Sequence, residues 1–374
     1  MESTCSELLD LCLRGEPWTP EFLHRAIAEE DGRALLRIVV ERLGDLFEPR
    51  LCQVYDRLFH QVVALSAPDL VSRLRRGAAS ARATVAGRVY VLSRVTLGAD
   101  VAVTSVLLDA AKKRFPSARV FFAGPRKNYE LFEADPRIEH HPAPYARSGS
   151  LHERLQASAQ LWFEDGIVLD PDSRLSQLGL IAVCLPERYF HFNSRSYGGD
   201  GADSLPELAA RWATETLGVE GARPYIAPLF VDNAPAEITV SLGVGENEAK
   251  RFDDAFERDL FRVLAATGRS LLIDMGGDEA ERERVTRALP PGMRTHSGAF
   301  APFAAQIARS KLFVGYDSAA GHAASACGVP LISIARGFVN ARMAARWRPC
   351  GTVLTGDATQ ILRDAAALVA QLIR

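Results

Sequence analysis

The stretch RVYVLSRVTLGADVAVTSVLLDAAKKRF, residues 88–115, decides the fold class of this chain. It opens on a short run of β-branched and aromatic residues, 89–92, which predicts a buried strand. Apolar side chains then recur at helical spacing over residues 101–115, and Pro116 ends that segment. A strand that passes through a short loop into a helix is the repeating unit of a mostly parallel sheet covered by helices.

The same alternation continues in two series, which predict two α/β lobes. The first lobe, residues 85–230, holds further strand-like runs at 120–123 and 167–169. The second lobe, residues 231–374, begins at a proline-bearing stretch. Its expected strands are residues 238–241, 271–274, 312–315 and 331–334.

Residues 1–84 follow a different pattern and are expected to form a helical N-terminal domain. Apolar positions such as Leu35, Val39 and Leu43 recur at helical spacing, whereas strand-like runs are few. The alanine- and arginine-rich residues 77–87 are expected to connect this extension to the first lobe. We expect the extension to serve an acceptor, a partner protein or self-association.

The composition argues against several classes of protein. The 374-residue chain has 44 lysines and arginines against 46 aspartates and glutamates, which leaves no broad basic surface for nucleic acid. Its six cysteines are scattered without close pairs, as expected in a reducing compartment. No apolar run approaches the ~20 residues that span a bilayer, and the N-terminus lacks a signal pattern. We therefore expect a soluble, cytoplasmic protein that does not bind nucleic acid.

Polar residues follow three of the expected strands, and the first of these loops is Gly98-Ala99-Asp100. Ligands of open α/β sheets gather at the carboxyl ends of strands, so Asp100 can enter a cleft there. Aspartate in this position also commonly caps the next helix. The residue type alone leaves both readings open.

The second loop, after the strand at 238–241, contains Gly243, Gly245 and Asn247 and is followed by Lys250. Glycines let a phosphate approach the backbone, and a lysine neutralises its charge. A lone Gly-x-Gly is also typical of an ordinary turn, and a lysine of a solvated helix. The loop therefore predicts a phosphate site only in combination with other residues.

The third loop leads from the strand at 312–315 into a helix and contains Asp317, Ser318, Ala319 and His322. Small side chains at a helix start expose backbone N–H groups to an anion. Asp317 can accept hydrogen bonds from sugar hydroxyls, and His322 can reach a phosphate. The alternative is an ordinary, tightly packed strand–helix–strand crossover.

At these loops the chain resembles the heptosyltransferase-like glycosyltransferases, glycosyltransferase family 9. The resemblance implies two facing Rossmann-like lobes of the GT-B type. The residues in corresponding positions are Asp100, Lys250, Asp317, Ser318 and His322. The resemblance implies Asp100 as the catalytic base, Lys250 as a ligand of the donor phosphate, and the third loop as the grip on the donor.

Two departures from the family pattern bear on these roles. Ala99 separates Gly98 from Asp100, which leaves the direction of the carboxylate open. Ala319 stands where the family usually has glycine, which can displace the phosphate-binding amides.

Two polar motifs of the first lobe have alternative readings. Asp170-Pro171-Asp172 contains an Asp-x-Asp, which in another glycosyltransferase architecture holds a divalent metal, but a turn is the more frequent meaning. Arg174 and Arg195 can bind acceptor hydroxyls or an acidic group, or lie in salt bridges. We favour a site without metal or other cofactor.

These observations together predict a glycosyltransferase. It would move a sugar from a nucleotide-sugar donor to a hydroxyl of an unknown acceptor, with inversion and without metal. A nucleotide-sugar epimerase and a non-catalytic nucleotide-sugar-binding module are the alternatives.

Overall fold

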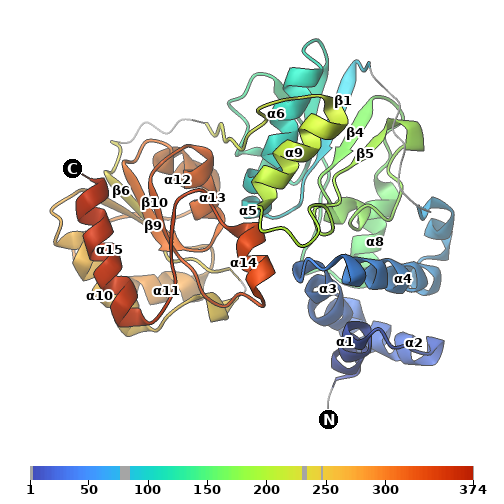
Figure 1. The fold of residues 1–374 in the computed structure, drawn as a ribbon, viewed down its shortest axis with the longest axis horizontal. Coiled ribbons are helices and arrows are strands. Elements are labelled where there is room, and N and C mark those ends of the chain that lie inside the picture. Colours follow the sequence, from blue (N-terminus) through green and yellow to red (C-terminus); the bar gives the residue numbers. More distant parts are fainter. Residues whose placement is uncertain (1–2, 76–84, 230–233, 246, 374) are drawn as a thin grey trace.

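The computed structural model describes residues 3–75, 85–229, 234–245 and 247–373 and contains two parallel β-sheets. Figure 1 shows three parts, namely a helical N-terminal region in blue, a first lobe in cyan and green, and a second lobe in orange and red. The two-lobed α/β architecture expected from the strand–helix rhythm is confirmed.

The sheet of the first lobe has the strand order β3-β2-β1-β4-β5, and its strands pair in parallel. Its strands are β1 (Arg88–Leu92), β2 (Arg119–Gly124), β3 (Ile138–Pro142), β4 (Ile167–Asp170) and β5 (Tyr189–His191). Its helices are α5 (Leu97–Ala99), α6 (Ser105–Arg114), α7 (Arg126–Tyr129), α8 (Leu151–Gln160) and α9 (Leu205–Leu217). A π-helical turn over Asp100–Thr104 joins α5 to α6. The central strand β1 is thus the strand that leads into the loop of Asp100.

The sheet of the second lobe has the order β11-β10-β9-β6-β7-β8, again in parallel. Its strands are β6 (Ile238–Ser241), β7 (Leu271–Asp274), β8 (Arg294–His296), β9 (Leu312–Tyr316), β10 (Leu331–Ile334) and β11 (Thr352–Leu354). Its helices are α10 (Asp254–Ala265), α11 (Glu279–Ala288), α12 (Phe300–Ile307), α13 (Ala319–Ala326), α14 (Ala341–Trp347) and α15 (Ala358–Leu372). A Cβ on Gly315 would lie 2.2 Å from the Ser241 carbonyl oxygen, so the central pair β6–β9 requires glycine there.

The N-terminal region is helical, as expected. It consists of α1 (Thr4–Arg14), α2 (Pro20–Ala28), α3 (Glu41–Asp45) and α4 (Pro49–Ser66), with a π-helical turn over Leu35–Val40 before α3. Its apolar core also takes in Leu151, Leu155, Leu180 and Ile181 of the first lobe. The region therefore packs on the first lobe as part of a shared core. The predicted domain boundaries at 84/85 and 230/231, and most of the expected connector, lie outside the described residues.

Helix α14 ties the second half of the chain to the other two parts (Figure 1). The buried Arg346 guanidinium donates to the carbonyl oxygens of Asp203 and Gly199 in the first lobe. Trp347 meets Phe47 of the helical region edge-to-face, with ring centroids 6.4 Å apart. All three parts therefore meet where α14 lies.

Candidate active site

A cleft of about 500 Å³ lies between the two lobes, at the carboxyl ends of β1, β6, β7 and β9. Its walls are the loops that follow these strands, together with Asp45 of the helical region and Met343 and Trp347 of α14. In α/β sheets this edge is where ligands bind, because strand ends and helix starts converge there. The cleft is therefore the candidate active site.

Gly98 brings the first lobe into contact with the start of α13. A Cβ added to Gly98 would lie 3.3 Å from both the Ala319 Cα and the His322 Cδ2. A side chain here would push the two walls apart. The glycine of the first loop therefore allows the lobes to approach closely at one end of the cleft.

The start of α13 presents unsatisfied polar groups to the cleft. Ser318 is the N-cap residue, but within the described part of the chain its side chain caps no backbone N–H and its buried Oγ has no hydrogen-bond partner. The first N–H groups of any helix lack partners within the helix and carry partial positive charge. Ser318, Ala319 and Ala320 all line the cleft, so this helix start can receive an anion.

Lys250 lies beside this helix start. Its Nζ is 2.5 Å from Asp317 Oδ2 and donates also to the Asp317 carbonyl oxygen. Gly243 and Gly245, in the same loop after β6, line the cleft with Lys250. Asn247 does not line it; its side chain accepts from the Ala249 N–H and caps a short turn. The structure thus brings together three of the four residues that the sequence singled out in this loop.

His322 lies one turn into α13 and faces the cleft with little exposed surface. Burial lowers the pKa of its imidazole, and Lys250 lowers it further, while Asp317 acts in the opposite direction. The ring is therefore neutral at neutral pH and offers one N–H to a ligand. It lies 5.8 Å from the Trp347 ring, in an edge-to-face arrangement.

Two carboxylates of the second lobe complete this wall, and no sequence motif marks Glu281 as one of them. Asp274 ends β7, and Glu281 lies in the first turn of α11. Burial raises the pKa of both carboxyls. The cap of α11 is Asp278, which accepts from the Glu281 N–H. Asp274 therefore forms part of the wall of the cleft, and Asp278 caps the helix that carries Glu281.

Asp100 points away from the cleft and is fully buried. Its carboxylate accepts hydrogen bonds of 2.6–2.7 Å from Ser93 Oγ, the Arg94 N–H, Thr104 Oγ1 and Asn128 Nδ2. Burial raises its pKa, and the four donors oppose that effect. The geometry does not favour Asp100 as a base, because no surface of the carboxylate is open to an acceptor.

Ala99 lines the cleft in the position where Asp100 was expected. The extra residue between Gly98 and Asp100 turns the aspartate by one helical position, which moves it from the cleft to the interior. The first departure from the family pattern therefore has a definite structural consequence.

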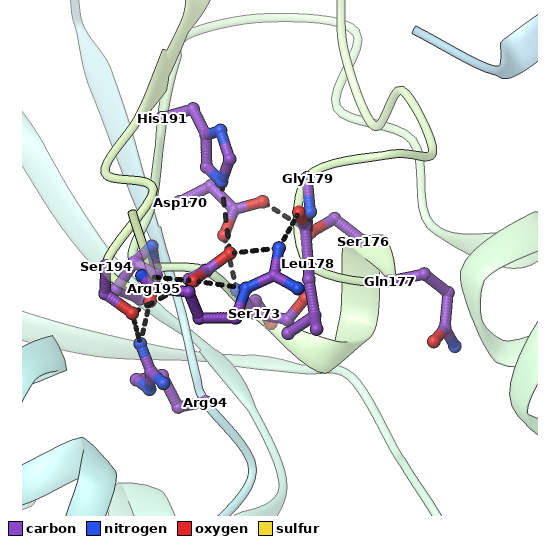
Figure 2. A network of polar contacts seen from close by, with 12 residues as sticks. Arg94, Asp170, Ser173, Ser176, Gln177, Leu178, Gly179, His191, Ser194 and Arg195 are labelled. Carbon is purple, nitrogen blue, oxygen red and sulfur yellow. Dashed lines mark hydrogen bonds and ion pairs between the residues drawn. The ribbon is translucent and has the colours of Figure 1, made fainter. Parts of the chain in front are cut away.

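Asp170 and Asp172 belong to an internal polar network, in which Figure 2 labels Asp170, His191 and Arg195. Asp170 accepts from the Ser173 N–H and from Ser176 Oγ and Tyr189 OH. Asp172 accepts from Arg195, with Nε to Oδ2 at 3.0 Å. These protein donors occupy the oxygens that a divalent ion would need, and neither aspartate lines the cleft.

Arg195 and Arg174 have different surroundings, although the sequence paired them. Burial raises the pKa of Asp172, but Arg195 and His191 outweigh it and hold that pKa far below its usual range. Arg195 lies in this buried ion pair, outside the cleft. Arg174 lines the cleft and pairs with Glu41 of the helical region at 2.5 Å. Only Arg174 is placed to meet a ligand in the cleft.

Asp45 was not singled out in the sequence, because nothing near it carries a recognisable motif. It ends α3 and lines the cleft from the side opposite the start of α13. Only the packing of the helical region against both lobes brings it there.

Solved structures share this architecture. The glycosyl transferase family 9 protein from Veillonella parvula matches with a TM-score of 0.57 at 15% identity, over 79% of this chain and 99% of that chain. The chain therefore has the two-lobed GT-B fold of the family 9 glycosyltransferases. The E. coli heptosyltransferase WaaC with ADP-2-deoxy-2-fluoro heptose matches with a TM-score of 0.54 at 16% identity, over 76% of this chain and 98% of that chain.

The E. coli ADP-heptose LPS heptosyltransferase II matches with a TM-score of 0.52 at 15% identity, over 76% of this chain and 99% of that chain. The GT-B fold, which the resemblance at the three loops implied, is thus confirmed. These matches take in nearly all of the known chains, so part of this chain has no counterpart in them. No family model and no curated protein matches the sequence. Within the described ranges, no helix is long and apolar enough to cross a membrane.

Proposed function

We propose that the chain is a glycosyltransferase that takes a sugar from a nucleotide-sugar donor held against the second lobe. The observation that carries this proposal is the start of α13, where Lys250 lies nearby and Ser318 Oγ has no partner in the ranges that the structure describes. A diphosphate supplies the negative charge and the acceptor oxygens that such a site lacks. ADP-linked sugars are the first donors to test, because WaaC structures were solved with ADP and with an ADP-linked sugar.

In this proposal the reaction is a direct displacement at the anomeric carbon, with inversion. The departing diphosphate gains negative charge, which Lys250 and the N–H groups at the start of α13 stabilise. These fixed groups act in place of a metal ion. His322, as a neutral donor, orients the phosphate.

The acceptor is proposed to enter from the first lobe and the helical region, where Arg174 lines the cleft. An enzyme of this kind works where nucleotide sugars are made, and we propose the cytoplasm. All six cysteines are described and carry free thiols, which suits a reducing compartment. Association of the helical region with a partner or a second copy remains a separate proposal.

A native mass-spectrometric screen of the purified chain against ADP-, UDP-, GDP- and dTDP-sugars tests this function. We expect the chain to retain one class of donor. In the presence of water or a simple alcohol, it should slowly release the nucleoside diphosphate of that donor. Conversion of the donor into an isomeric nucleotide sugar would indicate an epimerase instead. Binding with no turnover across a broad acceptor panel would indicate a binding module.

A further inference from the structure

Direct displacement requires a base near the acceptor hydroxyl, and the described residues offer few carboxylates in the cleft. Four carboxylates line it, and Asp274, Glu281 and Asp317 all belong to the second lobe, where the donor is proposed to bind. Asp317 is also held by Lys250. Asp45 is the one that reaches the cleft from the opposite wall.

The helical region holds Asp45 in place through contacts with the second lobe. Arg342 of α14 donates to the Phe47 carbonyl oxygen at 3.1 Å, and Asn340 donates to that of Leu46 at 3.4 Å. Phe47 also packs edge-to-face on Trp347. The end of α3 is therefore fixed by the same helix that lines the cleft, and the carboxylate of Asp45 with it.

Within the described residues, the Asp45 carboxylate accepts no hydrogen bond and lies in no ion pair. The neighbouring Glu41 forms ion pairs with three arginines, Arg174 at 2.5 Å, Arg147 at 3.7 Å and Arg154 at 3.8 Å. Burial raises the pKa of Asp45, against the effect of Arg174. A carboxylate with open lone pairs and a raised pKa is suited to accept a proton.

A second, smaller pocket of about 70 Å³ opens beside Asp45, away from the second lobe's loops. The residues that line both this pocket and the cleft are Asp45, Thr96, Ala99, Arg174 and Trp347. The pocket is also lined by Gln177 and Arg195, whose Nε2 and Nη1 atoms are buried and have no hydrogen-bond partner among the residues described. Two unpartnered donors fit an oxygen-bearing group, and ~10–15 Å³ suffices for one water-sized group.

We propose that Asp45 is the general base of the transfer, for an acceptor that places a carbonyl, carboxylate or hydroxyl oxygen in the small pocket. This inference rests on the proposed glycosyl transfer. The acceptor oxygen forms a bond to the anomeric carbon, and its proton passes to the Asp45 carboxylate. The bond from that carbon to the diphosphate oxygen breaks, and the diphosphate leaves with the electron pair.

The test compares three full-length chains, wild type, Asp45→Asn and the control Asp10→Asn, whose side chain is exposed on α1. The readout is nucleoside diphosphate released from the best donor of the screen, with water as acceptor. We expect Asp45→Asn to release it ~10²–10⁴-fold more slowly, since that is the usual effect of removing a general base. Its affinity for the nucleoside diphosphate and its unfolding midpoint should match those of the control.

The dependence of the rate on pH gives a second readout that a structural role would not change. Protonated Asp45 cannot accept a proton, so the wild-type rate should fall as pH drops through its raised pKa, above the usual ~3.9 of aspartate. The charged groups that face Asp45 are Glu41 of its own helix, Arg94 after β1, and Arg147 and Arg174; His322 of α13 titrates in the same cleft. This fall of the rate at low pH should be absent from Asp45→Asn and present in His322→Gln.

The possible failures are distinct. Near-normal release by Asp45→Asn overturns the inference and leaves the proposed function standing. A loss of rate matched by an equal loss of nucleotide affinity or stability also overturns it, because Asp45 would then be a structural residue. Failure of the wild-type chain to release nucleotide from any donor overturns the proposed function, and the inference falls with it.

Discussion

Two turns lie at the carboxyl ends of central strands, one in each lobe, and their polar side chains point in opposite directions. The first turn, residues 93–100, follows the central strand β1, and the second turn, residues 317–322, follows the central strand β9. In the first, Asp100 points inward and is held by four donors. In the second, Asp317, Ser318 and His322 line the cleft. A turn at the carboxyl end of a central strand is therefore not by itself a ligand site.

The difference follows from what each turn must satisfy locally. The first turn buries donors such as Ser93 Oγ and the Arg94 N–H, which need an acceptor away from water. The second turn is built from small residues, and the side-chain Oγ of its cap residue, Ser318, has no hydrogen-bond partner among the described residues. The first turn is complete without a ligand, whereas the second has hydrogen-bonding groups to offer one.

The largest expected effect comes from breaking the first turn with Asp100→Ala. Loss of the carboxylate leaves four buried donors unsatisfied, and one such group alone costs about 1–3 kcal/mol. We expect the first lobe to lose at least ~3 kcal/mol, visible as a lower midpoint in urea unfolding. The matched change in the second turn, Asp317→Ala, should cost only ~1 kcal/mol, since Asp317 accepts from Lys250 alone among the described side chains. Equal losses of unfolding free energy in Asp100→Ala and Asp317→Ala would contradict the difference between the two turns.

Lys250→Ala should have the next largest effect, on ligand binding. A charge-assisted hydrogen bond contributes about 1.5–3 kcal/mol, so affinity for a nucleoside diphosphate should fall roughly 10- to 100-fold. Affinity for the nucleoside alone should change little. Lys311→Ala is the control, because that lysine is exposed and pairs with Glu237. Equal losses for both ligands would show that Lys250 supports the shape of the cleft instead.

His322→Ala should weaken diphosphate binding by a smaller factor. Burial keeps the imidazole neutral, and a neutral hydrogen bond contributes about 1 kcal/mol, or roughly fivefold in affinity. Isothermal titration with diphosphate and nucleoside separates this effect from a loss of the pocket. A change in nucleoside affinity as large as that in diphosphate affinity would speak against a phosphate contact.

The smallest expected effect is that of a chelator. If Lys250 and the start of α13 stabilise the leaving group, excess EDTA should leave the rate of nucleotide release unchanged. Asp172→Ala is a poor probe of a metal here, because it would leave the buried Arg195 without its partner, at a cost of about 3–5 kcal/mol. Loss of activity on chelation, restored by magnesium or manganese, would contradict the proposed role of Lys250.

Much of the fold could be predicted from the sequence, because the central strands are continuous apolar runs. The predicted strands 89–92, 120–123 and 312–315 correspond to β1, β2 and β9 within one residue at either end. The strands β3, β5, β8 and β11 were missed. Ile138–Pro142 and Arg294–His296 carry polar side chains at sheet edges, so no apolar alternation marks them.

The site was harder to predict, since side-chain direction depends on packing. The pattern Gly98-Ala99-Asp100 does not show that Asn128, 28 residues further on, takes the aspartate into the interior. Nor does the pair Asp172 and Arg195 reveal itself in sequence, because 23 residues separate its members. Asp45 lies on a helix outside the α/β pattern, and only tertiary contacts bring it to the cleft.

If the start of α13 is a diphosphate site, a single titration of the wild-type chain will show it. Adenosine diphosphate and uridine diphosphate are compared with adenosine and uridine by calorimetry at physiological ionic strength. We expect at least one diphosphate to bind ten or more times tighter than its nucleoside, a difference of about 1.4 kcal/mol or more. Equal affinities of both diphosphates and their nucleosides, or no binding by any of the four, would contradict it.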